Sequence, residues 1–234
     1  AMNLSWSQIF RLGLVQMALG SIVVLTTSTL NRLMVVELSL PALLPGVLVG
    51  LHYGIQLSRP RWGFRSDVGS NRTRWIIGGM MTLALGGVGA TYAVTLFAVH
   101  YWLALIASIV SYGLIGIGVG ASGTSLLALL ATATAADRRA AAATITWLMM
   151  IFGIALTAGV AGQFLDPYSP RRLMMVVSVI ALLALVLTVL ALLNIERAVR
   201  SRASEPNIPF PEAFPAVWAA SQHRDCTIFS FLSM

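Results

Sequence analysis

The fold is decided by the thirty-residue apolar stretch Trp102-Leu-Ala-Leu-Ile-Ala-Ser-Ile-Val-Ser-Tyr-Gly-Leu-Ile-Gly-Ile-Gly-Val-Gly-Ala-Ser-Gly-Thr-Ser-Leu-Leu-Ala-Leu-Leu-Ala131, which contains no charged residue. A helix that crosses a bilayer needs about 20 consecutive apolar residues. This run therefore predicts a membrane-spanning helix over about 102–131. Similar apolar runs on either side predict five further spans, at about 12–30, 45–57, 75–99, 142–165 and 173–195.

The composition supports the same fold class. Of the 234 residues, 58% are apolar and only 10% are charged, whereas a soluble domain carries about 25% charged residues. This balance excludes a soluble globular domain and a disordered chain, and the single cysteine, Cys226, excludes a disulfide scaffold. We predict an all-α polytopic membrane protein with an interfacial N-terminus (1–11), a six-helix membrane domain (12–200) and an exposed C-terminal tail (201–234).

The basic residues indicate how the helices are oriented. All 15 are arginine, and most lie in the short segments between apolar runs, which argues against nucleic-acid binding. With six spans, eleven of them share one side of the membrane, and the other side has only Arg32, Arg171 and Arg172. Because cytoplasmic loops are enriched in Lys and Arg, both termini are predicted to be cytoplasmic.

Two sets of small residues predict close helix packing. Gly116 and Gly120 form a G-x-x-x-G step in the fourth span, and Gly159 and Gly162 lie in a row of small residues in the fifth. Small residues let membrane helices approach closely. The alternative is that the groove beside the fourth span admits a flat ligand or a partner helix.

The loop after the second span carries the most specific motif. It reads Arg59-Pro-Arg-Trp-Gly-Phe-Arg-Ser-Asp-Val-Gly-Ser-Asn-Arg-Thr-Arg-Trp75. Gly63 allows close backbone approach, Asp67 can cap a helix or pair with arginine, and Arg72 and Arg74 can bridge to neighbouring helix ends. The motif resembles the loop between helices two and three of the major facilitator superfamily.

His52 is the candidate pigment ligand. It lies inside the second span, where an ionisable side chain is a functional candidate by default. A neutral imidazole can ligate the magnesium of a chlorin, or it can serve as a hydrogen-bonded interior group. The sequence contains no intramembrane carboxylate pair, no metal-ligand cluster and no phosphate-binding or nucleophile motif, so we expect neither catalysis nor a protein-bound metal.

Several stretches resemble the PucC/LhaA family, the bacteriochlorophyll-delivery branch of the major facilitator superfamily. The resemblance covers roughly residues 4–200 and is specific over the first hundred. Its stretches are Leu4-Ser-Trp-Ser-Gln-Ile-Phe-Arg-Leu-Gly-Leu-Val-Gln16, Thr29-Leu-Asn-Arg-Leu-Met-Val-Val-Glu-Leu38, Pro45-Gly-Val-Leu-Val-Gly-Leu-His-Tyr53, Arg59-Pro-Arg-Trp-Gly63 with Ser66-Asp67, and Gly120-Ala-Ser-Gly-Thr-Ser-Leu126. The resemblance implies the N-terminal half of a major facilitator fold, built from two inverted three-helix repeats. A faint echo between Gly54–Pro60 and Gly162–Pro167 agrees with such repeats.

The resemblance implies a role in assembling light-harvesting complexes in the inner, intracytoplasmic membrane of purple bacteria. The implied partners are light-harvesting 1 polypeptides, the reaction centre and membrane lipids, and the implied cofactors are bacteriochlorophyll and carotenoid. Two alternatives stay open. The chain is half of a small-molecule transporter that needs a second half or a second copy, or it is a truncated, passive structural subunit whose tail 204–234 is not native.

Overall fold

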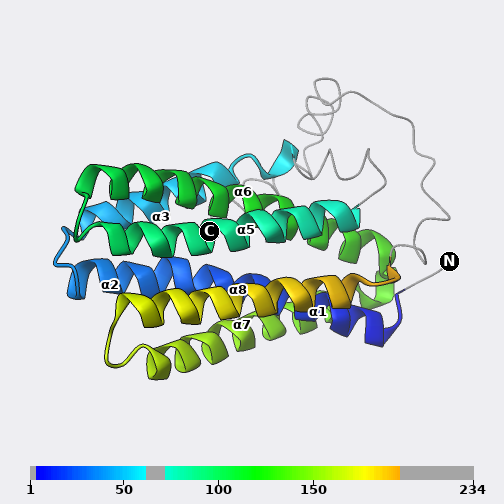
Figure 1. The fold of residues 1–234 in the computed structure, drawn as a ribbon. Coiled ribbons are helices and arrows are strands. Elements are labelled where there is room, and N and C mark those ends of the chain that lie inside the picture. The colour runs from blue at the N-terminus through cyan, green and yellow to red at the C-terminus, as the bar shows by residue number, and fades with distance from the viewer. Residues whose placement is uncertain (1–3, 62–71, 196–234) are drawn as a thin grey trace. The chain divides into compact units, whose positions relative to one another are not determined.

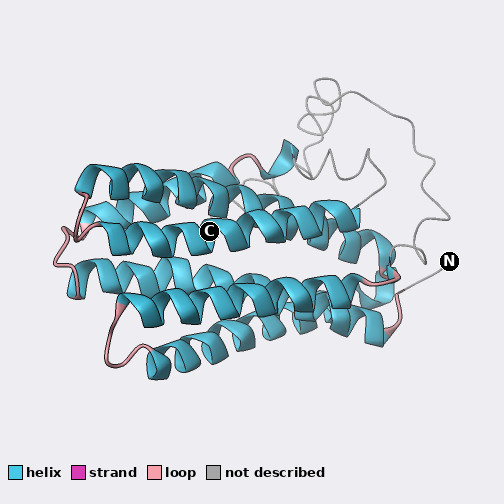
Figure 2. Ribbon diagram, in the orientation of Figure 1, coloured by secondary structure: helices cyan, strands magenta, loops and turns pink. Residues whose placement is uncertain are grey.

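A computed structural model describes residues 4–61 and 72–195 of the chain. Within these ranges there are helices and connecting turns and no strands (Figure 2). The fold class is therefore all-α, as predicted. The helices are α1 (Trp6–Val24), the π-helical turn η1 (Leu25–Thr29), α2 (Leu30–Val36), α3 (Leu43–Gln56), α5 (Arg72–Leu96), α6 (Tyr101–Ala133), the 3-10 turn η2 (Ala136–Arg138), α7 (Arg139–Phe164) and α8 (Pro170–Leu192).

Among the described residues, five helical segments are long and apolar enough to cross a membrane, and the chain is thus a multi-pass membrane protein. They are Trp6–Val36, Arg72–Leu96, Tyr101–Ala133, Ala136–Phe164 and Pro170–Leu192. The predicted second span is α3, which has only 14 residues. At about 1.5 Å per residue it covers about 21 Å, less than the bilayer core of about 30 Å.

The first span starts earlier than the apolar run suggests. α1 begins at Trp6 instead of near Leu12, because Ser5 and Gln8 form a capping box. The Ser5 hydroxyl accepts from the Gln8 amide, and the Gln8 side chain accepts from the Ser5 amide at 2.9 Å. These bonds satisfy amide groups that a helix N-terminus otherwise leaves unpaired. The segment predicted to be interfacial is therefore continuous with the first span.

The helices run side by side and alternate in direction (Figure 1). The connections after α2, α5 and α7 lie at one end of the bundle, while α1 and α7 begin and α8 finishes at the other. This alternation places Arg32 and Arg171 at one end and Arg11 and Arg139 at the opposite end. Of the arginines among the described residues, three lie at the first end and seven at the second, which agrees with the uneven distribution expected from the sequence.

The tightest helix contact joins α5 to α6. A Cβ built on Gly79 would lie 2.5 Å from the Ser122 backbone nitrogen, and one built on Gly118 would lie 2.5 Å from the Leu83 backbone nitrogen. Real Cβ atoms do not come so close to backbone, so only glycine fits at either position. The two backbones therefore touch without side chains between them, which is how small residues stabilise membrane helix pairs.

The pattern of helix neighbours has a twofold regularity. α1 packs against α7 and α8, α6 packs against α3 and α5, and α5 also packs against α8. Exchanging α1 with α6, α3 with α7 and α5 with α8 leaves this set of neighbouring pairs unchanged. Inverted three-helix repeats produce such a pattern.

Arginines at the basic end of the bundle donate hydrogen bonds to backbone carbonyl groups at or near the ends of helices. Arg11 of α1 donates to the Leu193 carbonyl just beyond α8 at 2.5 Å, and Arg72 of α5 donates to the Ala128 carbonyl of α6 at 3.3 Å. Arg139 donates to the Thr134 carbonyl at 3.2 Å. These contacts tie neighbouring helices together and offset the negative end of the helix dipole.

The π-helical turn in the first span is bonded to α6. The buried Tyr112 hydroxyl donates to the Thr26 carbonyl inside the turn at 2.7 Å. A π-helical turn departs from the regular α-helical bonding ladder, and such turns are often found at functional positions. Tyr112 therefore holds the irregular part of span one against α6.

Neighbouring glycines on α5 provide a matched test of the α5–α6 contact. We expect Gly79→Ala to lower the free energy of unfolding by about 1–3 kcal/mol, because the new methyl group overlaps α6 backbone. Gly78→Ala should be neutral or stabilising, because a Cβ there meets no atom within 4 Å. Thermal unfolding in detergent measures both, and equal effects of the two substitutions would contradict the packing.

Tyr112→Phe tests the bond to the π-helical turn. The change should lower the free energy of unfolding by about 1 kcal/mol, a usual value for an interhelical hydrogen bond in a membrane protein. The control is Tyr92→Phe, since the Tyr92 side chain is 55% exposed. If Tyr112→Phe were as stable as Tyr92→Phe in the same thermal assay, the hydroxyl would not be holding the turn.

Candidate functional site

A chain of polar side chains runs along α3 from His52 towards the basic end. His52, Gln56 and Arg59 are spaced by four and three residues, which places them on one side of a helix. The Gln56 amide nitrogen lies 2.9 Å from His52 Nε2, and Arg59 donates to the Gln56 carbonyl oxygen. The imidazole itself is only 1% exposed.

Arg59 determines how the side-chain amide of Gln56 is oriented, and through it which nitrogen of His52 accepts a hydrogen bond. A guanidinium can only donate hydrogen bonds, so the oxygen of the Gln56 side chain must face Arg59 and its NH₂ group must face His52. His52 Nε2 is then the acceptor, and a neutral imidazole carries its proton on Nδ1. Within the described residues the buried Nδ1 has no hydrogen-bond partner.

This arrangement bears directly on His52 as a magnesium ligand. A metal binds the ring nitrogen that has a free lone pair, and the Gln56 amide occupies that nitrogen here. Ligation at Nε2 would require the Gln56 bond to open and the buried ring to become accessible to a macrocycle. In this structure the imidazole is a hydrogen-bonded interior group, the second of the two readings that the sequence leaves open.

The glycines singled out for helix packing divide into two groups. Gly116 lies at the α3–α6 contact, where an added Cβ would be 2.8 Å from the His52 carbonyl oxygen, and Gly120 is buried on the same helix. Gly159 and Gly162, by contrast, make no close helix contact within the described residues, so their predicted packing stays a prediction. Both are exposed, and an added Cβ would meet no atom within 4 Å.

The close contact of α7 lies elsewhere, at Gly153. A Cβ there would be 2.7 Å from the Met17 carbonyl oxygen of α1. α7 is apolar on almost every side, so small residues on different faces look equivalent in the sequence. Which face turns inward depends on the helix rotation, and that becomes visible only in the fold.

The basic loop is described in part. Gly63 and Asp67 lie outside the described residues. Arg72 lies in the first turn of α5, where it bonds the end of α6 and so bridges neighbouring helices as its position suggested. Arg74 is exposed in the same turn.

Charged side chains of the described residues do not gather into a metal centre. Among residues 4–61 and 72–195 no group of three or more His, Cys, Asp or Glu side chains could hold an ion. One ion pair in these ranges, between Arg138 and Asp137 at 4.0 Å, is exposed. The expectation of a chain without catalytic or metal residues stays a prediction.

Arg59 is the residue of this site that the sequence did not connect to His52, whereas Gln56 lies near the histidine already in the sequence. Their spacing was the available signal, because residues four and seven positions after a helical histidine share its face. Arg59 appeared to belong to the loop, since α3 finishes at Gln56. The arginine folds back onto the helix, so the polar chain crosses that boundary.

Comparisons with known proteins identify the family of the chain. The family model described as "PUCC protein" matches residues 29–234. The chain is 61% identical to the bacteriochlorophyll synthase 44.5 kDa chain of Rhodobacter capsulatus, over 100% of this chain and 55% of that protein. It is 30% identical to protein PucC of the same organism over 85% of this chain and 46% of PucC.

A further relative is protein PucC of Cereibacter sphaeroides, which is 29% identical over 74% of this chain and 40% of its own length. The chain thus spans about half the length of these curated relatives. No solved structure matches it. Because the family match and the 61% identical alignment both reach residue 234, the segment 201–234 is part of what this chain shares with its relatives. The chain belongs to the PucC protein family.

Proposed function

We propose that the chain acts in the assembly of photosynthetic complexes in a bacterial membrane. In this role it packs with light-harvesting 1 polypeptides and the reaction centre, and it holds or hands over bacteriochlorophyll. The observation that carries the proposal is the similarity along the whole chain to a protein named for bacteriochlorophyll synthesis, together with its membership of the PucC family.

The outer surface of the bundle is suited to such partners. Only 22% of the apolar stretch of α7 and 28% of that of α8 are buried inside the chain, compared with 67% for the first span. Large side chains such as Trp147, Phe152 and Leu182 are exposed there. In a membrane these faces are suited to contact lipid, carotenoid, the apolar edge of a chlorin or another helix.

The hydrogen bond between Gln56 and His52 bears on where the chain would hold a pigment. Because Gln56 occupies its accepting nitrogen, we infer that pigment lies on the exposed apolar faces and that His52 positions α3 against α6. The proposed role is carrier and packing partner, without a reaction catalysed on the pigment. The proposed location is the bacterial inner, intracytoplasmic membrane, with the arginine-rich end and both termini on the cytoplasmic side.

Purification from a phototrophically grown host tests the assembly role. An affinity-tagged chain isolated in mild detergent should carry near-infrared bacteriochlorophyll absorption, and mass spectrometry of the same band should detect antenna polypeptides. The paired change Phe152→Ala and Leu156→Ala removes exposed area on α7 and should reduce the antenna polypeptides recovered. Leu182→Ala with Leu183→Ala on α8 is the matched comparison. A colourless wild-type band without antenna subunits would favour half of a small-molecule transporter instead.

A pair of substitutions tests the role of His52. We expect His52→Ala to lower the melting temperature while the pigment-to-protein ratio stays unchanged, because the imidazole holds a helix contact and not a metal. Gln56→Leu frees Nε2 and should leave the same ratio. Loss of pigment in His52→Ala at an unchanged melting temperature, with pigment retained in Gln56→Leu, would make His52 the ligand.

A further inference from the structure

A cavity of about 420 Å³ opens where α2 and α7 finish, at the end of the bundle opposite the arginine contacts. Its polar wall comes from two segments that are far apart in the sequence. The first span contributes one part, and the turn between α7 and α8 contributes the other. The polar lining residues are Ser28, Thr29, Arg32, Glu37, Asp166 and Tyr168.

The charged side chains that line this cavity do not hold the helices together. Within the described residues, Arg32, Glu37 and Asp166 make no ion pair and no side-chain hydrogen bond. The arginines at the opposite end, by contrast, bond helix carbonyls. Burial and the nearby Glu37 carboxylate raise the pKa of Tyr168, so its hydroxyl remains a hydrogen-bond donor. The cavity therefore offers one cation, two anions and three hydroxyl groups.

The cavity lies at the level of lipid headgroups. The helical run Trp6–Val36 has 31 residues, which at about 1.5 Å per residue is about 46 Å. A bilayer measures about 30 Å across its hydrocarbon core and about 40–45 Å with its headgroups. Arg32 is four residues from the end of this run and thus falls in the headgroup layer.

An exposed strip of small residues leads from the cavity along α7. Ala158 and Gly162 line the cavity itself, Gly159 lies between them along the helix, and Ala155 continues the strip towards the membrane centre. An added Cβ at Gly159 or Gly162 meets no atom within 4 Å. An extended hydrocarbon chain can therefore lie directly against the α7 backbone while its polar end occupies the cavity.

We propose that this cavity binds the headgroup of a phosphatidylethanolamine lipid. The phosphodiester lies at Arg32 and the hydroxyls of Ser28 and Thr29, and the ammonium lies between the carboxylates of Glu37 and Asp166. One acyl chain follows the small-residue strip. The ammonium donates up to three charge-assisted hydrogen bonds, which the quaternary nitrogen of phosphatidylcholine cannot do. Phosphatidylglycerol supplies no cation for the two carboxylates.

Native mass spectrometry of the purified, delipidated chain tests the proposal. Three lipids with identical acyl chains are titrated: phosphatidylethanolamine, phosphatidylcholine and phosphatidylglycerol. The wild-type chain should bind phosphatidylethanolamine about tenfold more tightly than phosphatidylglycerol, as expected for one lost charge-assisted interaction. Arg32→Gln should weaken phosphatidylethanolamine binding about tenfold. Glu37→Gln with Asp166→Asn should remove the preference over phosphatidylglycerol.

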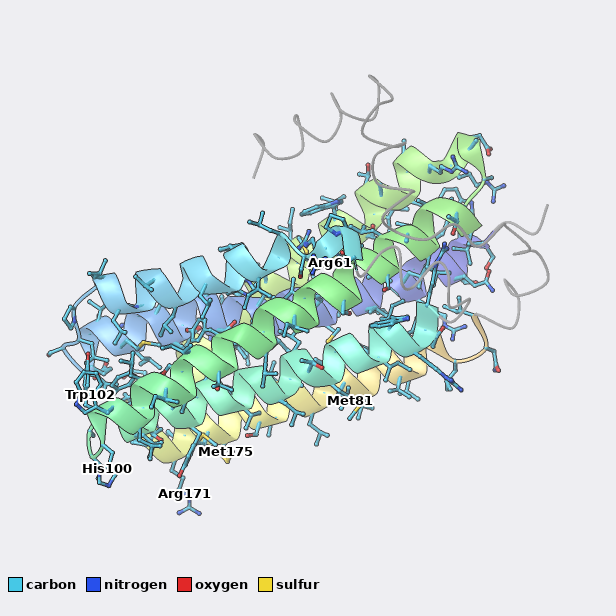
Figure 3. The ribbon with its side chains drawn as sticks, turned by 90° about the horizontal axis from the view of Figure 1, so that it is seen from above. Arg61, Met81, His100, Trp102, Arg171 and Met175 are labelled. Carbon is cyan, nitrogen blue, oxygen red and sulfur yellow. The ribbon has the colours of Figure 1, made fainter. Side chains whose placement is uncertain are left out.

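Two controls separate the site from general effects. Arg171 lies at the same end of the bundle, and its side chain points away from the helices (Figure 3). Arg171→Gln should therefore leave lipid binding unchanged, and equal melting temperatures of the two arginine variants exclude a folding defect. Gly159→Leu fills the strip and should weaken lipid binding without affecting stability, because the position is open.

Three results would overturn the proposal. The first is equal binding of the three lipids by the wild-type chain, and the second is equal loss of binding in Arg32→Gln and Arg171→Gln. The third is binding of water-soluble glycerophosphoethanolamine as tightly as the lipid, which would identify the cavity as a site for a free small molecule.

Discussion

The bundle depends on the direct backbone contact between α5 and α6. Membrane helices gain nothing by leaving lipid for one another unless their surfaces pack more closely than lipid allows. Gly79 and Gly118 meet this requirement together, since the carbonyl oxygen of each lies within 3.0 Å of where the other's Cβ would be. The rest of α6 serves other neighbours, with Gly116 against α3 and Tyr112 bonded to the first span. One helix thus positions three others.

Among the remaining helices, α1 has the central position that α6 has beside α3 and α5. It packs against α7 and α8 as α6 packs against α3 and α5, and glycine makes close contacts in both sets. Gly153 meets the α1 backbone, as Gly116 meets the α3 backbone. The sequence echo between Gly54–Pro60 and Gly162–Pro167 falls at the ends of α3 and α7, which are exchanged by the same relation. Packing and sequence therefore point to the same repeat.

Long apolar runs and the distribution of arginine were sufficient to predict an all-α membrane fold, because both are set by the bilayer and not by particular contacts. The start of α1 was missed, since the capping box of Ser5 and Gln8 extends the helix beyond its apolar part. Helix rotation was not readable for α6 and α7, whose residues are apolar on every side. For that reason Gly159 looked equivalent to Gly153, although only Gly153 touches another helix of the described chain.

The two ends of the bundle have different physical roles. At the basic end, Arg11, Arg72 and Arg139 are bonded to carbonyl groups of neighbouring helices, so any rearrangement there must break hydrogen bonds that join helices. At the opposite end, Arg32 and the carboxylates around the cavity bond to nothing within the described residues. A ligand can enter or leave there without a loss of helix contacts. At that same end Arg172 donates to the backbone carbonyls of Asp166 and Pro167, so Arg32 differs from its neighbour in having no such partner. An arginine thus stabilises the structure where a carbonyl lies within its reach and stays available to a ligand where none does.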